Sequence, residues 1–210
     1  MREITLHELH RLALLSRRAL WDAAELAGHD TPKIYLHWTA GGYWHFFDDY
    51  HINIDEDGGL HASTEDLAEV LAHTWRRNTG GVGVAICGCY DATTTDLGSA
   101  PPTLAQIEAM AQAVAVLCEE LGLPIEKACV LTHGEAADIE DGDTAGYGYD
   151  EAYGPKNGCE KWDLEYLGTL ESPAYHPYAT DGSRGGDVLR GKAIYWQNKW
   201  RADAERALPE

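Results

Sequence analysis

Residues 82–89 read VGVAICGC, a run of small and β-branched side chains that carries no charge. Such a run is typical of a central strand whose two faces are both buried. Two further apolar runs, KIYLHW at 33–38 and ACVLT at 128–132, predict buried strands on either side of it in the sequence. Residues 50–54 and 60–63 flank the turn sequence DEDGG, and this arrangement predicts a β-hairpin.

Two long helices are predicted by capping boxes. Thr5 stands three residues before Glu8, and Thr103 stands three residues before Gln106, which is the spacing of this helix start. Behind both starts, apolar residues recur at helical intervals until a glycine ends the pattern. Helical spacing predicts three further helices, at 66–75, 163–170 and 188–208.

The order of these elements predicts an α/β fold, in which helices pack on a mixed central β-sheet. A chain of 210 residues can bury one full core, so we expect a single domain. Within it we expect a helical extension at 1–30, the main domain at 31–170, and an extension at 171–210 whose helix packs on the same domain. Residues 134–160 are rich in acidic residues, glycine and tyrosine and have no period, which predicts one long loop.

The charge balance limits the partners of this chain. There are 35 acidic side chains against 16 basic ones, and the formal net charge is -19. Because this charge repels phosphate backbones and anionic lipid surfaces, we expect neither nucleic acid nor a membrane as a partner. Residues 1–21 contain no apolar stretch long enough for a signal peptide, so a cytoplasmic location is expected. The sequence does not predict an oligomeric state.

Five cysteines are present, an odd number without the paired spacing of a structural zinc site, so reduced thiols are expected. Three other potential metal ligands, His37, His133 and Asp163, each stand next to an apolar run. Two imidazoles and one carboxylate would fill three positions of a tetrahedral zinc ion and leave the fourth to a water molecule. Such a site is hydrolytic. Lone histidines are also common in cores and on surfaces, so the residues alone leave both interpretations open.

Six short sequence motifs follow one another along the chain: YLHWTAGG, YHINIDEDGGL, NTGGVGVAICG, PPTLAQIEAM, VLTHGE and KWD. With them the chain resembles the zinc-dependent N-acetylmuramoyl-L-alanine amidases, a family that includes peptidoglycan recognition proteins and small phage lysozyme-type amidases. The resemblance covers residues 33–167. It implies a mixed central sheet flanked by helices, with Zn²⁺ in an open groove above the sheet.

Position by position, the resemblance implies that His37, His133 and Asp163 are the metal ligands. Tyr50 matches the tyrosine that phage-type members hold beside the zinc, and Lys161 matches their active-site lysine. Members that use a glutamate on the central strand would place it in GVGVAICG, where this chain has no acidic residue. The chain therefore resembles the tyrosine and lysine subtype.

The roles that the resemblance implies for Tyr50 and Lys161 also agree with the general chemistry of amide hydrolysis. When a metal-activated water attacks an amide carbonyl, a hydroxyl and an ammonium group nearby can stabilise the oxyanion or protonate the leaving nitrogen. The competing interpretation is that Tyr50 packs against a neighbouring strand and that Lys161 is a solvated surface charge.

Further residues are expected around this centre. Glu135 stands two residues after His133, so in an extended backbone both side chains point the same way, and Glu135 could act as a base or orient a ligand. Thr39, His73 and Trp75 are expected to bind substrate, although Trp75 could instead be a packed core residue. Cys159, four residues before Asp163, is an alternative third ligand.

The resemblance implies an enzyme that hydrolyses the amide between the lactyl group of N-acetylmuramic acid and L-alanine, with peptidoglycan or a muropeptide as substrate. Phage endolysis and cytoplasmic recycling of wall fragments are both compatible settings. A non-catalytic peptidoglycan-binding module and an amidase for another amide are the alternatives. The interval from His133 to Asp163 is longer than the resemblance implies, and we expect its loop, with Tyr147, Tyr149 and Tyr153, to act as a lid that governs substrate choice.

Overall fold

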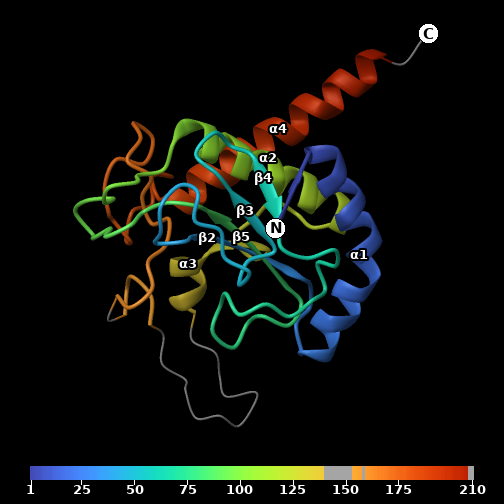
Figure 1. Cartoon of the computed structure of the whole chain (residues 1–210), viewed down its shortest axis with the longest axis horizontal. Helices are drawn as coiled ribbons and strands as arrows, with labels where there is room; N and C mark the ends of the chain where they lie inside the picture. Colours follow the sequence, from blue (N-terminus) through green and yellow to red (C-terminus); the bar gives the residue numbers. More distant parts are fainter. Residues whose placement is uncertain (140–152, 158, 208–210) are drawn as a thin grey trace.

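The computed structural model describes residues 1–139, 153–157 and 159–207. They form a six-stranded mixed β-sheet with helices packed on it (Figure 1), so the predicted α/β fold is confirmed. The strands are β1 (Arg2–Ile4), β2 (Lys33–Trp38), β3 (Ile52–Ile54), β4 (Leu60–Ala62), β5 (Gly81–Ile86) and β6 (Val130–Thr132). The helices are α1 (Leu6–Leu26), α2 (Leu104–Leu121), α3 (His133–Ala137) and α4 (Gly185–Ala207).

The strand order is β1-β4-β3-β5-β2-β6. Strand β5 pairs in parallel with β2 and β3, and β2 pairs in parallel with β6, whereas β4 runs antiparallel to β3 and β1. The apolar run that begins at residue 82 is therefore a central strand, as predicted, and the hairpin is formed by β3 and β4. Because β2, β5 and β6 are parallel, their carboxyl ends meet at one edge of the sheet, where ligands bind in open α/β sheets.

The two faces of the sheet differ. Helices α1, α2 and α4 cover one face, with α2 in contact with both of the others. Leu36, Val84 and Ile52 are aligned across β2, β5 and β3 and belong to the hydrophobic core that the helices share. Since side chains alternate along a strand, His37 and its register partner Ala85 lie on the opposite face. This face carries the candidate site.

Both predicted capping boxes are present. The hydroxyl of Thr5 accepts a hydrogen bond from the backbone N–H of Glu8, and that of Thr103 accepts one from Gln106. Gly122 ends α2 in a left-handed conformation, with φ of 71°. Helix α4 begins at Gly185, three residues earlier than its apolar pattern begins, and its carboxyl-terminal part extends away from the body (Figure 1).

Several predictions about local structure were wrong. Residues 66–75 form turns instead of a helix, because Leu67 is buried while Val70 and Trp75 of the same pattern are exposed. Residues 163–170 form no helix either, since Leu164 has a φ of 59°, which a right-handed helix cannot contain.

Two further differences concern strand ends. The expected loop at 134–160 begins with α3, whose own capping box joins Thr132 to Glu135. The central strand predicted at 82–89 ends earlier than expected, because β5 ends at Ile86 and Cys89 has a φ of 63°. Strand β1 was not predicted, since its three residues have no readable period.

All five cysteines lie in the described ranges and are free thiols. In the same ranges, none of the helices is both long and apolar enough to cross a bilayer. Tyr147 and Tyr149 of the expected lid lie outside the described residues.

Candidate metal centre and its cleft

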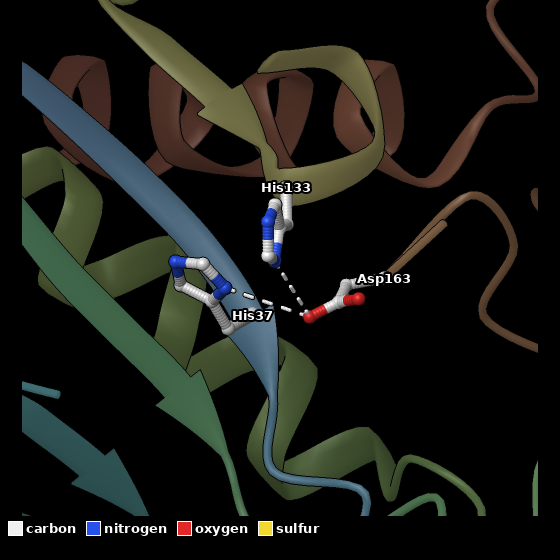
Figure 2. A group of neighbouring side chains, drawn as sticks. All are labelled: His37, His133 and Asp163. Carbon is white, nitrogen blue, oxygen red and sulfur yellow. Dashed lines mark ion pairs between the residues drawn. The ribbon is translucent and has the colours of Figure 1, made fainter. Parts of the chain in front are cut away.

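Three side chains from separate parts of the chain converge at the carboxyl edge of the parallel strands (Figure 2). His37 is the penultimate residue of β2, and His133 is the first residue of α3, directly after β6. Asp163 comes from an irregular segment and faces both histidines. Its Oδ2 atom is 3.5 Å from Nδ1 of His37 and 3.4 Å from Nδ1 of His133.

These distances fit a zinc ion. Two ligand atoms about 2.1 Å from zinc, at a tetrahedral angle, are separated by about 3.4 Å. Direct hydrogen bonds between a charged nitrogen and a carboxylate are shorter, at about 2.7–2.9 Å. Moreover, Nδ1 of His37 is buried and has no hydrogen-bond partner among the described residues. The donor set of two imidazoles and one carboxylate would leave a fourth position open, as in catalytic zinc sites.

The protonation states also suit a cation. Burial lowers the pKa of His37 to about 4, so its imidazole is neutral near pH 7, the form that binds a metal. Burial alone would raise the pKa of Asp163. The electrostatic attraction of His133 and His37 outweighs burial and holds the pKa of this carboxyl below its usual range, so Asp163 is a carboxylate.

Thr74 fixes the orientation of the His37 ring. Its Nε2 atom lies 3.3 Å from the hydroxyl oxygen of Thr74, and the same oxygen lies 3.0 Å from Nδ1 of His73. If Nδ1 of His37 holds a metal, Nε2 carries the proton and donates to Thr74, whose own hydroxyl hydrogen is then free for His73. Sequence reasoning missed Thr74, and its only signal was its place beside His73.

A cleft of about 800 Å³ opens over this centre. Seven residues that the sequence predicts for the site line it: Thr39, Tyr50, His73, Trp75, His133, Lys161 and Asp163. His37 is fully buried beneath it. The cleft wall also includes aromatic residues that were not predicted, Trp38, Tyr90 and Trp162, of which Trp162 lies inside the KWD string. The aromatic wall suits the apolar faces of sugars and peptides.

Tyr50 and Lys161 stand at this cleft. The ring of Tyr50 lies 5.0 Å from that of His37, and its hydroxyl donates to the backbone oxygen of Trp38 at 3.4 Å. Burial and the nearby charge of Asp163 raise the pKa of Tyr50, so the hydroxyl remains a proton donor. Tyr50 precedes β3 instead of opening it. Lys161 is exposed on the cleft wall.

The three expected substrate-binding residues differ in exposure. Trp75 is 60% exposed and available to a ligand, which argues against a packed core role. His73 is buried, and burial lowers its pKa to about 2, so it is neutral. The hydroxyl of Thr39 accepts hydrogen bonds from the backbone N–H groups of Gly88 and Gly41, so this residue also holds the loop after β2.

Glu135 does not reach the cleft. The backbone turns into α3 at His133, so the extended geometry that would align Glu135 with His133 is absent. The Glu135 carboxylate is buried and accepts hydrogen bonds from both terminal nitrogens of Arg190. Burial raises the pKa of Glu135, but Arg190 and Lys127 outweigh this effect and keep the group ionised. A direct catalytic role is therefore not supported by its position.

Cys159 is also outside the converging group. Its sulfur lies 3.1 Å from the hydroxyl of Tyr175, while the carboxylate that meets the two histidines belongs to Asp163. The described end of the expected lid is tied to the site by its backbone. The carbonyl of Tyr153 accepts a hydrogen bond from the N–H of Lys161 at 3.1 Å.

A comparison with known protein families supports the resemblance. A family model described as N-acetylmuramoyl-L-alanine amidase matches residues 12–147, which is more than half of the chain. The matched segment includes His37 and His133 and ends before Asp163. A solved structure, Drosophila PGRP-LB wild-type, is 14% identical over 57% of this chain and 84% of that chain, with a TM-score of 0.38. No curated protein gave a significant match.

Proposed function

The chain belongs to the N-acetylmuramoyl-L-alanine amidase family, and from this premise we propose that it is a zinc-dependent peptidoglycan amidase. The bond cleaved is the amide between the lactyl group of N-acetylmuramic acid and L-alanine. The observation that carries the proposal is the convergence of His37, His133 and Asp163 beneath an open cleft, at the spacing of a tetrahedral zinc site.

Each residue of this centre would have a separate role in hydrolysis. Bound zinc would supply a Lewis acid and lower the pKa of a water molecule. Thr74 orients His37 through its Nε2 atom. Tyr50 and Lys161 would donate hydrogen bonds to the carbonyl oxygen as negative charge develops there, or a proton to the leaving nitrogen. The exposed ring of Trp75 would hold substrate at the cleft mouth.

A non-catalytic peptidoglycan-binding module is the second candidate. It would need the cleft but neither the metal ligands nor the proton donors. The presence of His37, His133 and Asp163, with Tyr50 and Lys161 beside them, favours the enzyme. An amidase directed to a different amide would share all of these residues, and only a comparison of substrates separates it from the main proposal.

The biological setting is also a proposal. The net charge of -19 disfavours contact with an anionic wall polymer, so small wall fragments in the cytoplasm suit the protein better than phage endolysis. Turnover of small muropeptides and of intact wall, measured side by side, would compare the two settings.

Metal analysis and digestion of muropeptides test the proposal. The purified chain should carry about one zinc ion and release free L-alanine amino ends, which mass spectrometry detects. Tyr50→Phe and Lys161→Ala should retain zinc and lower kcat at least tenfold, since such donors act on the transition state and contribute roughly 10²-fold or more. Zinc-loaded wild-type protein that binds muropeptides without cleaving them would favour the binding module.

A further inference from the structure

Two of the three metal-site residues are followed, two positions later, by a glutamate. Glu135 follows His133, and Glu165 follows Asp163. Both glutamate side chains are 1% exposed, so each is a buried charge that needs a partner. Neither lines the cleft. The partners come from the amino-terminal end of α4 and the residue just before it, in a part of the chain that the family match does not reach.

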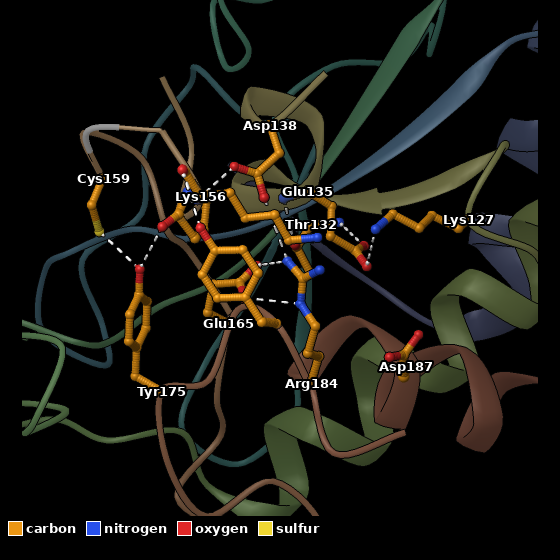
Figure 3. Close-up of polar contacts among 12 residues, drawn as sticks. Lys127, Thr132, Glu135, Asp138, Lys156, Cys159, Glu165, Tyr175, Arg184 and Asp187 are labelled. Atoms are coloured by element: carbon orange, nitrogen blue, oxygen red, sulfur yellow. Dashed lines mark hydrogen bonds and ion pairs between the residues drawn. The ribbon is translucent and has the colours of Figure 1, made fainter. Parts of the chain in front are cut away.

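Arg184 holds Glu165 (Figure 3). Its Nε donates to one carboxylate oxygen at 3.0 Å and its Nη2 to the other at 2.6 Å, which is the bidentate geometry that only a guanidinium provides. Arg184 is itself buried, and its Nη2 also lies 3.8 Å from Asp138 at the end of α3. One arginine thus joins the Asp163 segment to the helix that begins with His133.

Arg190 holds Glu135 in the same way. Its two terminal nitrogens donate to the two carboxylate oxygens at 2.7 and 2.9 Å, and Nη1 also donates to the backbone oxygen of Val130 in β6. Glu135 in turn accepts from the backbone N–H of Thr132, directly before His133. Arg190 therefore ties together the end of β6 and the start of α3, between which His133 is placed.

At three glycines the surrounding atoms leave no room for a Cβ atom. A Cβ atom on Gly186 would lie 2.6 Å from a Glu135 oxygen, and one on Gly134 would lie 2.9 Å from a Glu165 oxygen. The N–H of Gly185 donates to the backbone oxygen of Glu165 at 3.0 Å. These contacts bring α4 directly against both ligand-bearing segments.

Regular structure alone does not fix either of these two segments. Helix α3 has five residues, which is too short to be stable alone, and Asp163 lies in an irregular segment. Leu164, next to Asp163, has a φ of 59°, a conformation that costs about 1 kcal/mol or more for a residue with a Cβ. Such a conformation persists only where surrounding contacts impose it, and the Arg184–Glu165 pair is the adjacent contact.

We propose that Arg184 and Arg190 are positioning residues, which set His133 and Asp163 at ligand spacing before a metal ion binds. The inference rests on the proposed zinc site. Buried ion pairs contribute little net stability compared with apolar replacements, so their presence behind two ligands is better explained by placement than by stability. Neither arginine touches substrate or metal, and both act through Glu165 and Glu135.

Zinc affinity of the full chain, measured by competition with a chromophoric chelator, tests the proposal. Arg184→Gln and Arg190→Gln should each weaken zinc binding about 10- to 100-fold, the range for residues that orient metal ligands. They should also alter the visible absorption spectrum of the Co²⁺-substituted protein, which reports ligand geometry. Arg184→Lys keeps the charge but loses the bidentate fork, so it should bind zinc with an intermediate affinity.

Lys192→Met is the matched control. Lys192 lies on the same helix and pairs with Glu108 of α2 at 2.6 Å, away from both ligand segments. This variant removes an ion pair of α4 and should leave zinc affinity and the Co²⁺ spectrum unchanged. A general loosening of α4 would instead move zinc affinity in the control as well, and that result would overturn the proposal.

The remaining outcomes are also decisive. Should either Gln variant fail to fold, the variant with both Arg184→Leu and Glu165→Leu removes the buried charges together and is expected to fold. It should still bind zinc at least tenfold more weakly than wild type. Wild-type affinity in the folded variants would refute the positioning role alone. A wild-type chain that binds no zinc would refute the proposed function instead.

Discussion

Replacement of Thr74 by valine is the sharpest single test of how the site is prepared for a metal. Valine has nearly the same shape as threonine but lacks the hydroxyl that lies 3.3 Å from His37 Nε2 and 3.0 Å from His73 Nδ1. Without this acceptor, the His37 proton is no longer favoured on Nε2. The proton can then sit on Nδ1, the atom that faces Asp163, and a protonated nitrogen cannot bind a metal.

Two magnitudes follow from the structure. The hydrogen bond of His37 to Thr74 is long, so the loss of zinc affinity should lie at the lower end of the usual 10- to 100-fold range, near tenfold or about 1.4 kcal/mol. The metal-free protein should lose about 1–3 kcal/mol of stability, because the change leaves buried imidazole nitrogens without a partner. Calorimetric titration with Zn²⁺ measures the first effect, and urea unfolding measures the second.

Thr74→Ser is the matched control, since it keeps the hydroxyl and removes only a methyl group. It should bind zinc as wild type does, although the small cavity lowers stability by roughly 1 kcal/mol. Equal zinc affinities of the valine and serine variants would refute the argument that Thr74 sets the tautomer of His37.

Three further predictions extend these tests. His133→Ala should lose zinc, so that chelator no longer lowers its Tm; retention of about one zinc ion would remove His133 from the ligand set. Gly185→Ala should destabilise the fold by about 1–3 kcal/mol in chemical unfolding, because the new Cβ would overlap the carbonyl oxygen of Leu164. The control is Gly42→Ala, where a Cβ would meet no other atom, and its stability should stay within about 0.5 kcal/mol of wild type. Trp75→Ala should raise KM roughly 2- to 10-fold with little change in kcat, and an unchanged KM would contradict a substrate contact.

Many of the helices and strands could be predicted because they depend on local sequence patterns. The capping boxes at Thr5 and Thr103 are read from spacings of three residues, and the structure confirms both helix starts. Apolar runs identified the parallel strands, and His37 and His133 then follow from the rule that parallel strands end at one edge. The helix expected at 66–75 was wrong because an apolar spacing predicts a helix only where the rest of the protein covers it, and Val70 and Trp75 remain uncovered.

The placement of Asp163, the proposed third ligand, could not be predicted from local patterns, and the reason lies in α4. Asp163 follows no strand or helix, and its neighbour Leu164 has a backbone that the sequence does not favour. Its position depends on Glu165 meeting Arg184, a contact whose two residues carry no mutual signal in the sequence. A guanidinium, a buried carboxylate and two glycines must all meet before this geometry can form. The Asp163 segment and α4 therefore have to be considered together: a change in α4 should be expected to alter metal binding although α4 contributes no ligand.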